Sequence, residues 1–154
     1  MRFSLLLFVL SCYIAKASDS DRFVKSYAYS TNLCVVVTEG DFEWRSIGSY
    51  TIRLHEMVDD QREPAGEFYS GLVRPRDGTV EAVLFKDVDG DGKPDVVVTI
   101  RNAGTGQYLS SDAFVINGKH LSLLAHVEDL GPNADCVSAL RKQLKADKAA
   151  KLKP

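Results

Sequence analysis

Four aspartates alternate through one short segment of the chain, "DVDGDGKPD" at 87–95, and carboxylates in such a pattern can bind a cation. They are Asp87, Asp89, Asp91 and Asp95, with Gly92 at the sixth position. This order opens an EF-hand calcium loop, but Val98 stands where an EF-hand requires a bidentate Glu, so an EF-hand is excluded. Two interpretations stay open: a short calcium hairpin built from the four aspartates, or a tight turn in which they accept hydrogen bonds from its own amides.

No other group of residues has the spacing of a catalytic or metal site. His55, His120 and His126 follow neither an H-x-x-H nor a comparable ligand pattern. The serines of "RSIGSY" (45–50) stand outside the G-x-S-x-G motif, and no pair of carboxylates is set apart for acid–base work. The sequence therefore predicts a protein that is not an enzyme and requires no cofactor.

A Gly-rich segment, "RNAGTGQY" at 101–108, has the residue types of a binding loop. Gly104 and Gly106 permit close approach of the main chain, and between them Thr105 offers a hydroxyl. After Gln107, Tyr108 supplies a large rigid face with a polar tip, which suits an anchor at an interface. The alternative is a plain hairpin turn with the tyrosine packed beside it.

Two further features belong to this candidate binding surface. Arg101 stands at the base of the loop, where it would either pair with a carboxylate of a partner or face solvent. Ser49 and Tyr50, at the end of "RSIGSY", repeat the hydroxyl and tyrosine of the loop and are candidates for a secondary contact.

The elements that must position this loop are predicted to be strands. Residues 49–57 alternate clearly, with Tyr50, Ile52 and Leu54 on one face. Similar segments cover 23–29, 32–40, 67–74, 78–88, 94–101, 108–118 and 120–128. Turn residues join them, and Asn117-Gly118 is a strong hairpin signal. About eight strands at this spacing predict an all-β fold, either an antiparallel β-sandwich or a flattened barrel.

The C-terminal segment has the pattern of a helix. Val137, Leu140 and Leu144 share one helical face, and Asp135 is a plausible N-cap. From Lys145 the chain is rich in lysine, and 145–154 is predicted to be a flexible basic tail.

The first 17 residues read as a signal peptide for export. Arg2 precedes an apolar run, and Ala15-Lys16-Ala17 predicts cleavage before Ser18. A rival interpretation takes "VLSC", which ends at Cys12, as a lipoprotein box. Residues 18–154 then form a single domain with 17 basic and 21 acidic residues, a net charge of −4. This charge speaks against nucleic acid and anionic membranes as partners and favours a basic one.

Two cysteines remain after residue 17. In an oxidising compartment Cys34 and Cys136 predict a disulfide, worth roughly 4 to 5 kcal/mol for a loop of this length. The alternative is a pair of buried thiols, because Cys34 lies in the apolar run "LCVVV".

From "VVVTEGDFEWRSIGSYTIRL" through "GLVRPRDGTVEAVLFKDVDGDGKPDVVVTIRNAGTGQYLSSDAF", the chain closely resembles the periplasmic inhibitors of invertebrate-type lysozyme. The resemblance implies an exported bacterial β-sandwich that inserts its Ser-Gly-x-Tyr loop into the substrate cleft of the lysozyme. Here that motif reads Thr105-Gly106-Gln107-Tyr108, so the hydroxyl is kept and a methyl is added.

A second functional hypothesis follows from the aspartates of 87–95. It describes a calcium-stabilised extracellular β module that binds a glycan or a surface protein. An exposed strand edge would also allow a homodimer under either hypothesis.

Overall fold

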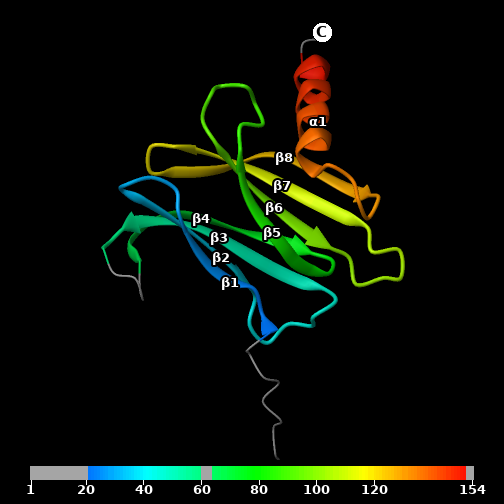
Figure 1. The fold of residues 1–154 in the computed structure, drawn as a ribbon, viewed down its shortest axis with the longest axis horizontal. Helices are drawn as coiled ribbons and strands as arrows, with labels where there is room; N and C mark the ends of the chain where they lie inside the picture. Colours follow the sequence, from blue (N-terminus) through cyan, green and yellow to red (C-terminus); the bar gives the residue numbers. More distant parts are fainter. Residues whose placement is uncertain (1–20, 60–63, 152–154) are drawn as a thin grey trace, which may run out of the picture.

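The computed structural model describes residues 21–59 and 64–151, which form two four-stranded antiparallel sheets and one helix (Figure 1). The first sheet has the order β1 (Val24–Ala28), β2 (Leu33–Glu39), β3 (Gly48–Met57) and β4 (Ala65–Arg76). The second has the order β5 (Thr79–Lys86), β6 (Asp95–Arg101), β7 (Leu109–Asn117) and β8 (His120–Leu130), and α1 (Cys136–Lys151) follows. The predicted antiparallel sandwich with a C-terminal helix is confirmed, and the two sheets do not close into a barrel. The predicted signal peptide lies outside the described residues.

The two sheets enclose one apolar core. In each strand every second residue points inward, so Val35 and Val37 of β2 meet Ile52 and Leu54 of β3. The other buried members of this core are Tyr50, Val80, Val96, Val98, Ile100, Phe114, Ile116 and Leu121. The alternation read from the sequence therefore corresponds to the inward face of the sandwich.

Helix α1 covers the outer face of the second sheet. Leu140 and Leu144 pack with Val97, Ala113 and Ala125, which explains why β6 is buried on both of its faces. None of the helices in the described ranges is long and apolar enough to cross a bilayer.

The start of α1 agrees with the sequence and its end does not. Asp135 Oδ1 accepts a hydrogen bond from the Ser138 amide at 3.1 Å, which confirms the predicted N-cap. The predicted flexible tail from Lys145 is wrong as far as Lys151, because the helix continues to that residue. Alanine, leucine and lysine are strong helix formers, and Gln143 donates to Asp147 across one turn at 2.9 Å.

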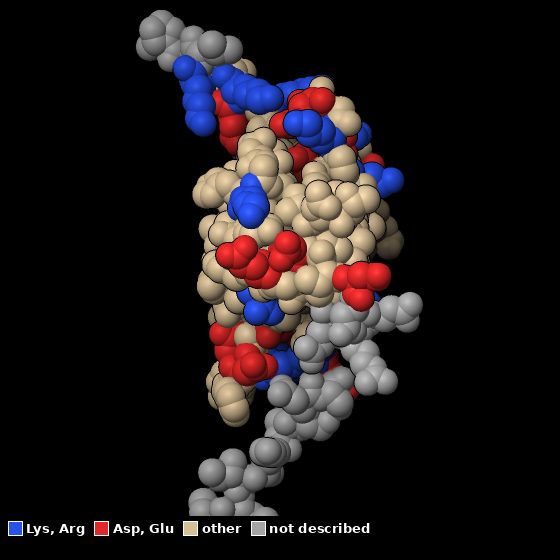
Figure 2. Space-filling model, turned by 90° about the vertical axis from the view of Figure 1, so that its left-hand side faces the viewer, with Lys and Arg blue, Asp and Glu red and all other residues tan. Residues whose placement is uncertain are grey.

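The connections that matter for binding meet at one end of the sandwich. The β2–β3, β4–β5, β6–β7 and β8–α1 connections all lie on the right-hand side of Figure 1. Figure 2 shows the opposite end, where acidic side chains gather near the middle and basic ones toward α1. The β6–β7 connection, 102–108, contains the predicted binding loop Gly104–Tyr108, and Arg101 ends β6 just before it.

The predicted disulfide is wrong, because Cys34 and Cys136 are both free and buried. Cys34 alternates with the inward-facing Val35, so its side chain faces the outer side of the first sheet. Cys136 begins α1 beside Thr99, on the outer side of the second sheet. Packed sheets lie about 10 Å apart, whereas a disulfide needs Cα atoms within about 7 Å.

Reduction is therefore expected to leave the thermal unfolding midpoint unchanged. Burial raises the pKa of both thiols, so little thiolate forms and alkylation of the native protein should be slow. For the protein that begins at Ser18, mass spectrometry after iodoacetamide treatment without reductant should show two labels on the urea-unfolded protein and none on the native one. If the unfolded protein takes up no label and reduction lowers its thermal unfolding midpoint, the two cysteines form a disulfide after all.

Candidate binding site

The loop 102–108 is a closed turn whose shape requires glycine. The Asn102 amide donates to the Tyr108 carbonyl at 2.9 Å, and the Gln107 amide donates to the Gly104 carbonyl at 3.0 Å. The ring of Tyr108 lies over Gly106, where an added Cβ would come within 2.4 Å of the ring. Gln107 has a φ of 46°, an uncommon left-handed conformation for a residue other than glycine. The loop thus holds its tyrosine against its own main chain.

Arg101 braces the base of this loop. Its guanidinium pairs with both carboxylate oxygens of Glu81, with Nη2 at 2.8 Å from Oε1. It also donates to the carbonyls of Gln107 at 3.0 Å and Pro132 at 3.3 Å. The charge is therefore already paired within the chain, and its donors hold the β6–β7 loop beside the β8–α1 connection.

The tip of the loop is open to solvent. Gly104, Thr105, Gly106 and Gln107 are exposed, and 51% of Tyr108 is exposed. The structure therefore places five of the predicted residues, Gly104 to Tyr108, in one connection and the sixth, Arg101, at the end of β6 beside it. The Thr105 hydroxyl and the Tyr108 ring are accessible to a partner.

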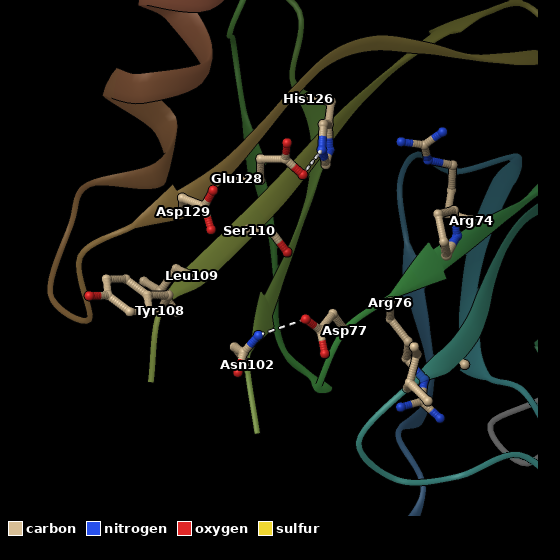
Figure 3. A pocket seen from close by; sticks show the side chains of 13 residues that line it. Arg74, Arg76, Asp77, Asn102, Tyr108, Leu109, Ser110, His126, Glu128 and Asp129 are labelled. Carbon is tan, nitrogen blue, oxygen red and sulfur yellow. Dashed lines mark hydrogen bonds and ion pairs between the residues drawn. The ribbon is translucent and has the colours of Figure 1, made fainter. Parts of the chain in front are cut away.

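A groove runs beside the loop, between the edge strands of the two sheets (Figure 3). Arg74 and Asp77 line it from β4 and the β4–β5 turn, and His126 and Glu128 line it from β8. Tyr108 also lines it, and Asn102, another lining residue, donates to Asp77 at 2.8 Å. The loop 102–108 and the open seam of the sandwich thus form a continuous surface.

A buried ionic cluster lies at the inner side of this groove. Asp112 is fully buried in β7 and accepts hydrogen bonds from Tyr50 at 2.5 Å and from His126 at 2.7 Å. Arg74 donates to both of its oxygens, at 3.0 and 3.1 Å. Burial, and then the charge of Asp112, raises the pKa of the Tyr50 hydroxyl, which therefore stays a donor. The cluster joins the two sheets where their edges are open.

The structure contradicts the Tyr50 half of the predicted secondary contact, whereas the Ser49 half stays a prediction because Ser49 is half-buried. Tyr50 is completely buried and its hydroxyl belongs to the cluster, so it cannot touch a partner. Ser49 donates its hydroxyl to Glu43 Oε1 at 2.7 Å and shapes the β2–β3 connection. The signal that could have revealed the cluster is Asp112 itself, a charged residue directly before the apolar run Ala113–Ile116 in a predicted strand.

The aspartates of 87–95 form a turn that binds its own amides. Asp87 accepts from Gly90 at 2.7 Å and from Gly92 at 3.1 Å. The carboxylates of Asp87, Asp89 and Asp95 lie within 4.8 Å of one another, and Asp91 is not in this group. Instead, Asp91 accepts from the Lys93 amide at 2.7 Å. The turn described by the second interpretation is present, and calcium binding stays a prediction.

A two-layer β-sandwich that displays a rigid loop beside an open seam is suited to binding another macromolecule rather than to catalysis. Residues 21–144 match the family model described as the periplasmic lysozyme inhibitor of I-type lysozyme. The chain belongs to this family.

Two solved structures support the same relationship. The crystal structure of the Aeromonas hydrophila inhibitor aligns with a TM-score of 0.70 at 39% identity, covering 77% of this chain and 98% of that one. The same inhibitor in complex with Meretrix lusoria lysozyme aligns with a TM-score of 0.69 at 39% identity, covering 77% of this chain and 95% of the other. A search of curated proteins gives no match.

Replacing Tyr50 by phenylalanine tests the cluster. Tyr50→Phe removes one hydrogen bond to a buried carboxylate and should lower the free energy of unfolding by roughly 1.5 to 3 kcal/mol. Urea denaturation would measure this, with Tyr27→Phe as the control, because Tyr27 is only half-buried and contacts Phe85 at the sheet edge. Equal losses in both variants would contradict a special role for the cluster.

The aspartate turn makes a prediction about pH. Burial, and then the charges of Asp89 and Asp91, raises the pKa of Asp95. Because the pKa of Asp95 in the folded protein lies above its unfolded value of about 3.9, protonation of this carboxyl favours the folded state. This stabilisation is complete below pH 3.9 and is lost as the pH rises through the pKa of the folded state. Asp95→Asn should therefore unfold at a higher temperature than the parent at pH 7 in a chelator, with the difference shrinking as the pH falls toward 3.9.

The same comparison of the parent with Asp95→Asn, repeated with calcium in place of the chelator, tests for a bound cation. A cation bound by Asp87, Asp89 and Asp95 would stabilise the parent and reverse the order of the two melting temperatures. An unchanged order at millimolar calcium would remove the metal from this turn.

Proposed function

We propose that this chain inhibits invertebrate-type lysozyme by inserting the loop Gly104–Tyr108 into the substrate cleft. The observation that carries the proposal is the tip of the loop, Thr105–Tyr108, which is exposed and held by hydrogen bonds within the loop. It lies at one end of a chain whose sequence is 39% identical to that of an inhibitor crystallised with a lysozyme. The family description places such inhibitors in the periplasm, in agreement with the export signal predicted for 1–17.

The chemistry of the target explains the residues at the tip. A lysozyme cleft holds two carboxylates, one that acts as the acid and one that acts as nucleophile or stabiliser. The Thr105 hydroxyl and the Tyr108 phenol are donors that can bind such carboxylates without offering a bond to cleave. Because the glycines carry no side chains, the main chain can enter a cleft shaped for a thin polysaccharide.

Rigidity and charge add to this interaction. The bonds from Arg101 and the packing of Tyr108 on Gly106 order the loop before it binds, which lowers the entropic cost of association. A net charge of −4 after residue 17 would speed the encounter with a basic enzyme, and the rate would fall with added salt.

The first test compares invertebrate-, chicken- and goose-type lysozymes in a lysis assay with increasing amounts of the protein. Loss of activity for the invertebrate type is the expected result. Unchanged lysis by all three would contradict the proposal and would leave the calcium-stabilised binding module as the better hypothesis.

Tyr108→Ala should weaken the inhibition of invertebrate-type lysozyme by about tenfold or more, because it removes the anchor of the loop. The fold should survive, since the ring lies over Gly106 of its own loop, is half-exposed and is not part of the apolar core. Thr105→Ala should cost less, roughly 0.5 to 1.5 kcal/mol for one hydrogen bond, and Thr105→Ser is the matched control that keeps the hydroxyl. An unchanged inhibition constant for Tyr108→Ala, with its midpoint of unfolding intact, would exclude the loop from the mechanism.

A further inference from the structure

A second connection at the same end of the sandwich exposes large apolar side chains. The β2–β3 connection, 40–47, carries Phe42, Trp44 and Ile47, and we name it the aromatic arm. Phe42 is fully exposed, and Trp44 is 80% exposed. Groups of exposed apolar side chains on a soluble protein mark interaction sites, and aromatic residues are the most effective anchors at interfaces.

The aromatic arm is exposed although its main chain is tightly held. Arg76 is buried and donates to the carbonyls of Trp44 at 3.2 Å, Arg45 at 2.9 Å and Ser49 at 2.9 Å. Arg22 adds a bond to the Glu43 carbonyl at 2.8 Å. A buried guanidinium with several carbonyl partners fixes the path of the arm, so the exposure of its aromatic rings does not come from a loose loop.

Two further details show that the arm is ordered around its exposed rings. The Glu43 carboxylate accepts from the amide and the hydroxyl of Ser49, and these bonds lower the pKa of Glu43. Phe42 has a φ of 60°, a left-handed conformation that is strained for a bulky residue. Strain at a fully exposed aromatic residue gains nothing for the fold and points to a role in binding.

The aromatic arm is continuous with the surface around Tyr108. Ile47 and Tyr108 line the same groove. Arg76 also donates to the Gly78 carbonyl in the β4–β5 turn, and the neighbouring Asp77 accepts from Asn102 at the start of the loop 102–108. One set of polar contacts therefore fixes the arm, the turn and the inhibitory loop relative to one another.

We propose that the aromatic arm is a second contact with the same lysozyme, in which Phe42 and Trp44 bind the rim of the cleft that Tyr108 enters. This inference rests on the proposed function. The rim of a basic enzyme offers arginine and lysine side chains, and the faces of tryptophan and phenylalanine attract such cations while their area excludes water. Two rigidly connected anchors would slow dissociation more than either one alone.

Trp44 provides a direct readout, because it is the only tryptophan of the sequence. The protein would be labelled with 5-fluorotryptophan, and its single fluorine resonance would be followed while unlabelled invertebrate-type lysozyme is added. A shifted resonance with reduced exposure to solvent at saturation is the expected result. A resonance that does not change while the lysozyme is fully inhibited would overturn the proposal and leave the function intact.

Substitutions test the contribution to affinity. The double variant Phe42→Ala/Trp44→Ala should dissociate at least tenfold faster and inhibit correspondingly more weakly, whereas Leu84→Ala, an exposed apolar residue in mid-strand on β5, should behave as the parent. Phe42→Gly should weaken inhibition without lowering the midpoint of unfolding, because glycine tolerates this φ. A residue with a purely structural role would lose stability instead.

Other occupants of the arm would give different results. If the arm joins two copies of this chain, sedimentation will show a dimer that the double variant dissociates, with inhibition unchanged, and the proposal is wrong. If the parent protein does not bind invertebrate-type lysozyme, the proposed function fails together with this inference. Inhibition that is lost with Tyr108→Ala but unchanged in the double variant removes the aromatic arm alone.

Discussion

The binding end of this protein depends on one buried cation, Arg76. A guanidinium taken out of water is costly unless each of its donors finds a partner, and here the partners are main-chain carbonyls of the aromatic arm and of the β4–β5 turn. The nearest acidic group, Glu43, lies 3.9 Å from Nη2. Because carbonyls of separate connections converge on one side chain, these connections cannot move independently without leaving a buried charge unpaired.

A second charged group serves the seam of the sandwich in a different way. Asp112 is surrounded by Tyr50 and Arg74 from the first sheet and by His126 from its own sheet, so hydrogen bonds replace apolar contact where the edges of the sheets are open. Such a cluster is weak support for high stability, since desolvation offsets much of the attraction. Its consequence is geometric: it fixes β4 relative to β8, and these strands carry the groove beside Tyr108.

The sequence predicted the features that depend on local pattern. Alternation located the strands because the inward face of each strand is apolar, and Asp135 marked the helix start because an N-cap bond spans only three residues. Tyr50 and Tyr108 show where such reasoning ends. Each follows a hydroxyl or amide residue in a Gly-containing segment. Tyr50 is nevertheless buried in the core, with its hydroxyl bound to Asp112 far along the chain, whereas Tyr108 is exposed. The predicted disulfide is wrong for the same reason, which is that long-range packing cannot be read from local pattern. An oxidising compartment favours disulfides in general, but it does not determine which faces of the sheets Cys34 and Cys136 occupy.

The sequence does not predict the aromatic arm as a binding surface. Its apolar residues have neither the period of a strand nor that of a helix, and they lie between glycines, a pattern typical of a turn. Only the structure shows that the arm is both rigid and exposed. Aromatic residues are usually buried in the core, or they lie on mobile segments. In this protein, buried hydrogen bonds from Arg76 hold the main chain of the arm, and the rings of Phe42 and Trp44 still face solvent. This arrangement favours tight association. Because the main chain of the aromatic arm is ordered before binding, its loss of conformational entropy is part of the free energy of folding, where burial of the core offsets it. More of the contact free energy at the interface then opposes dissociation.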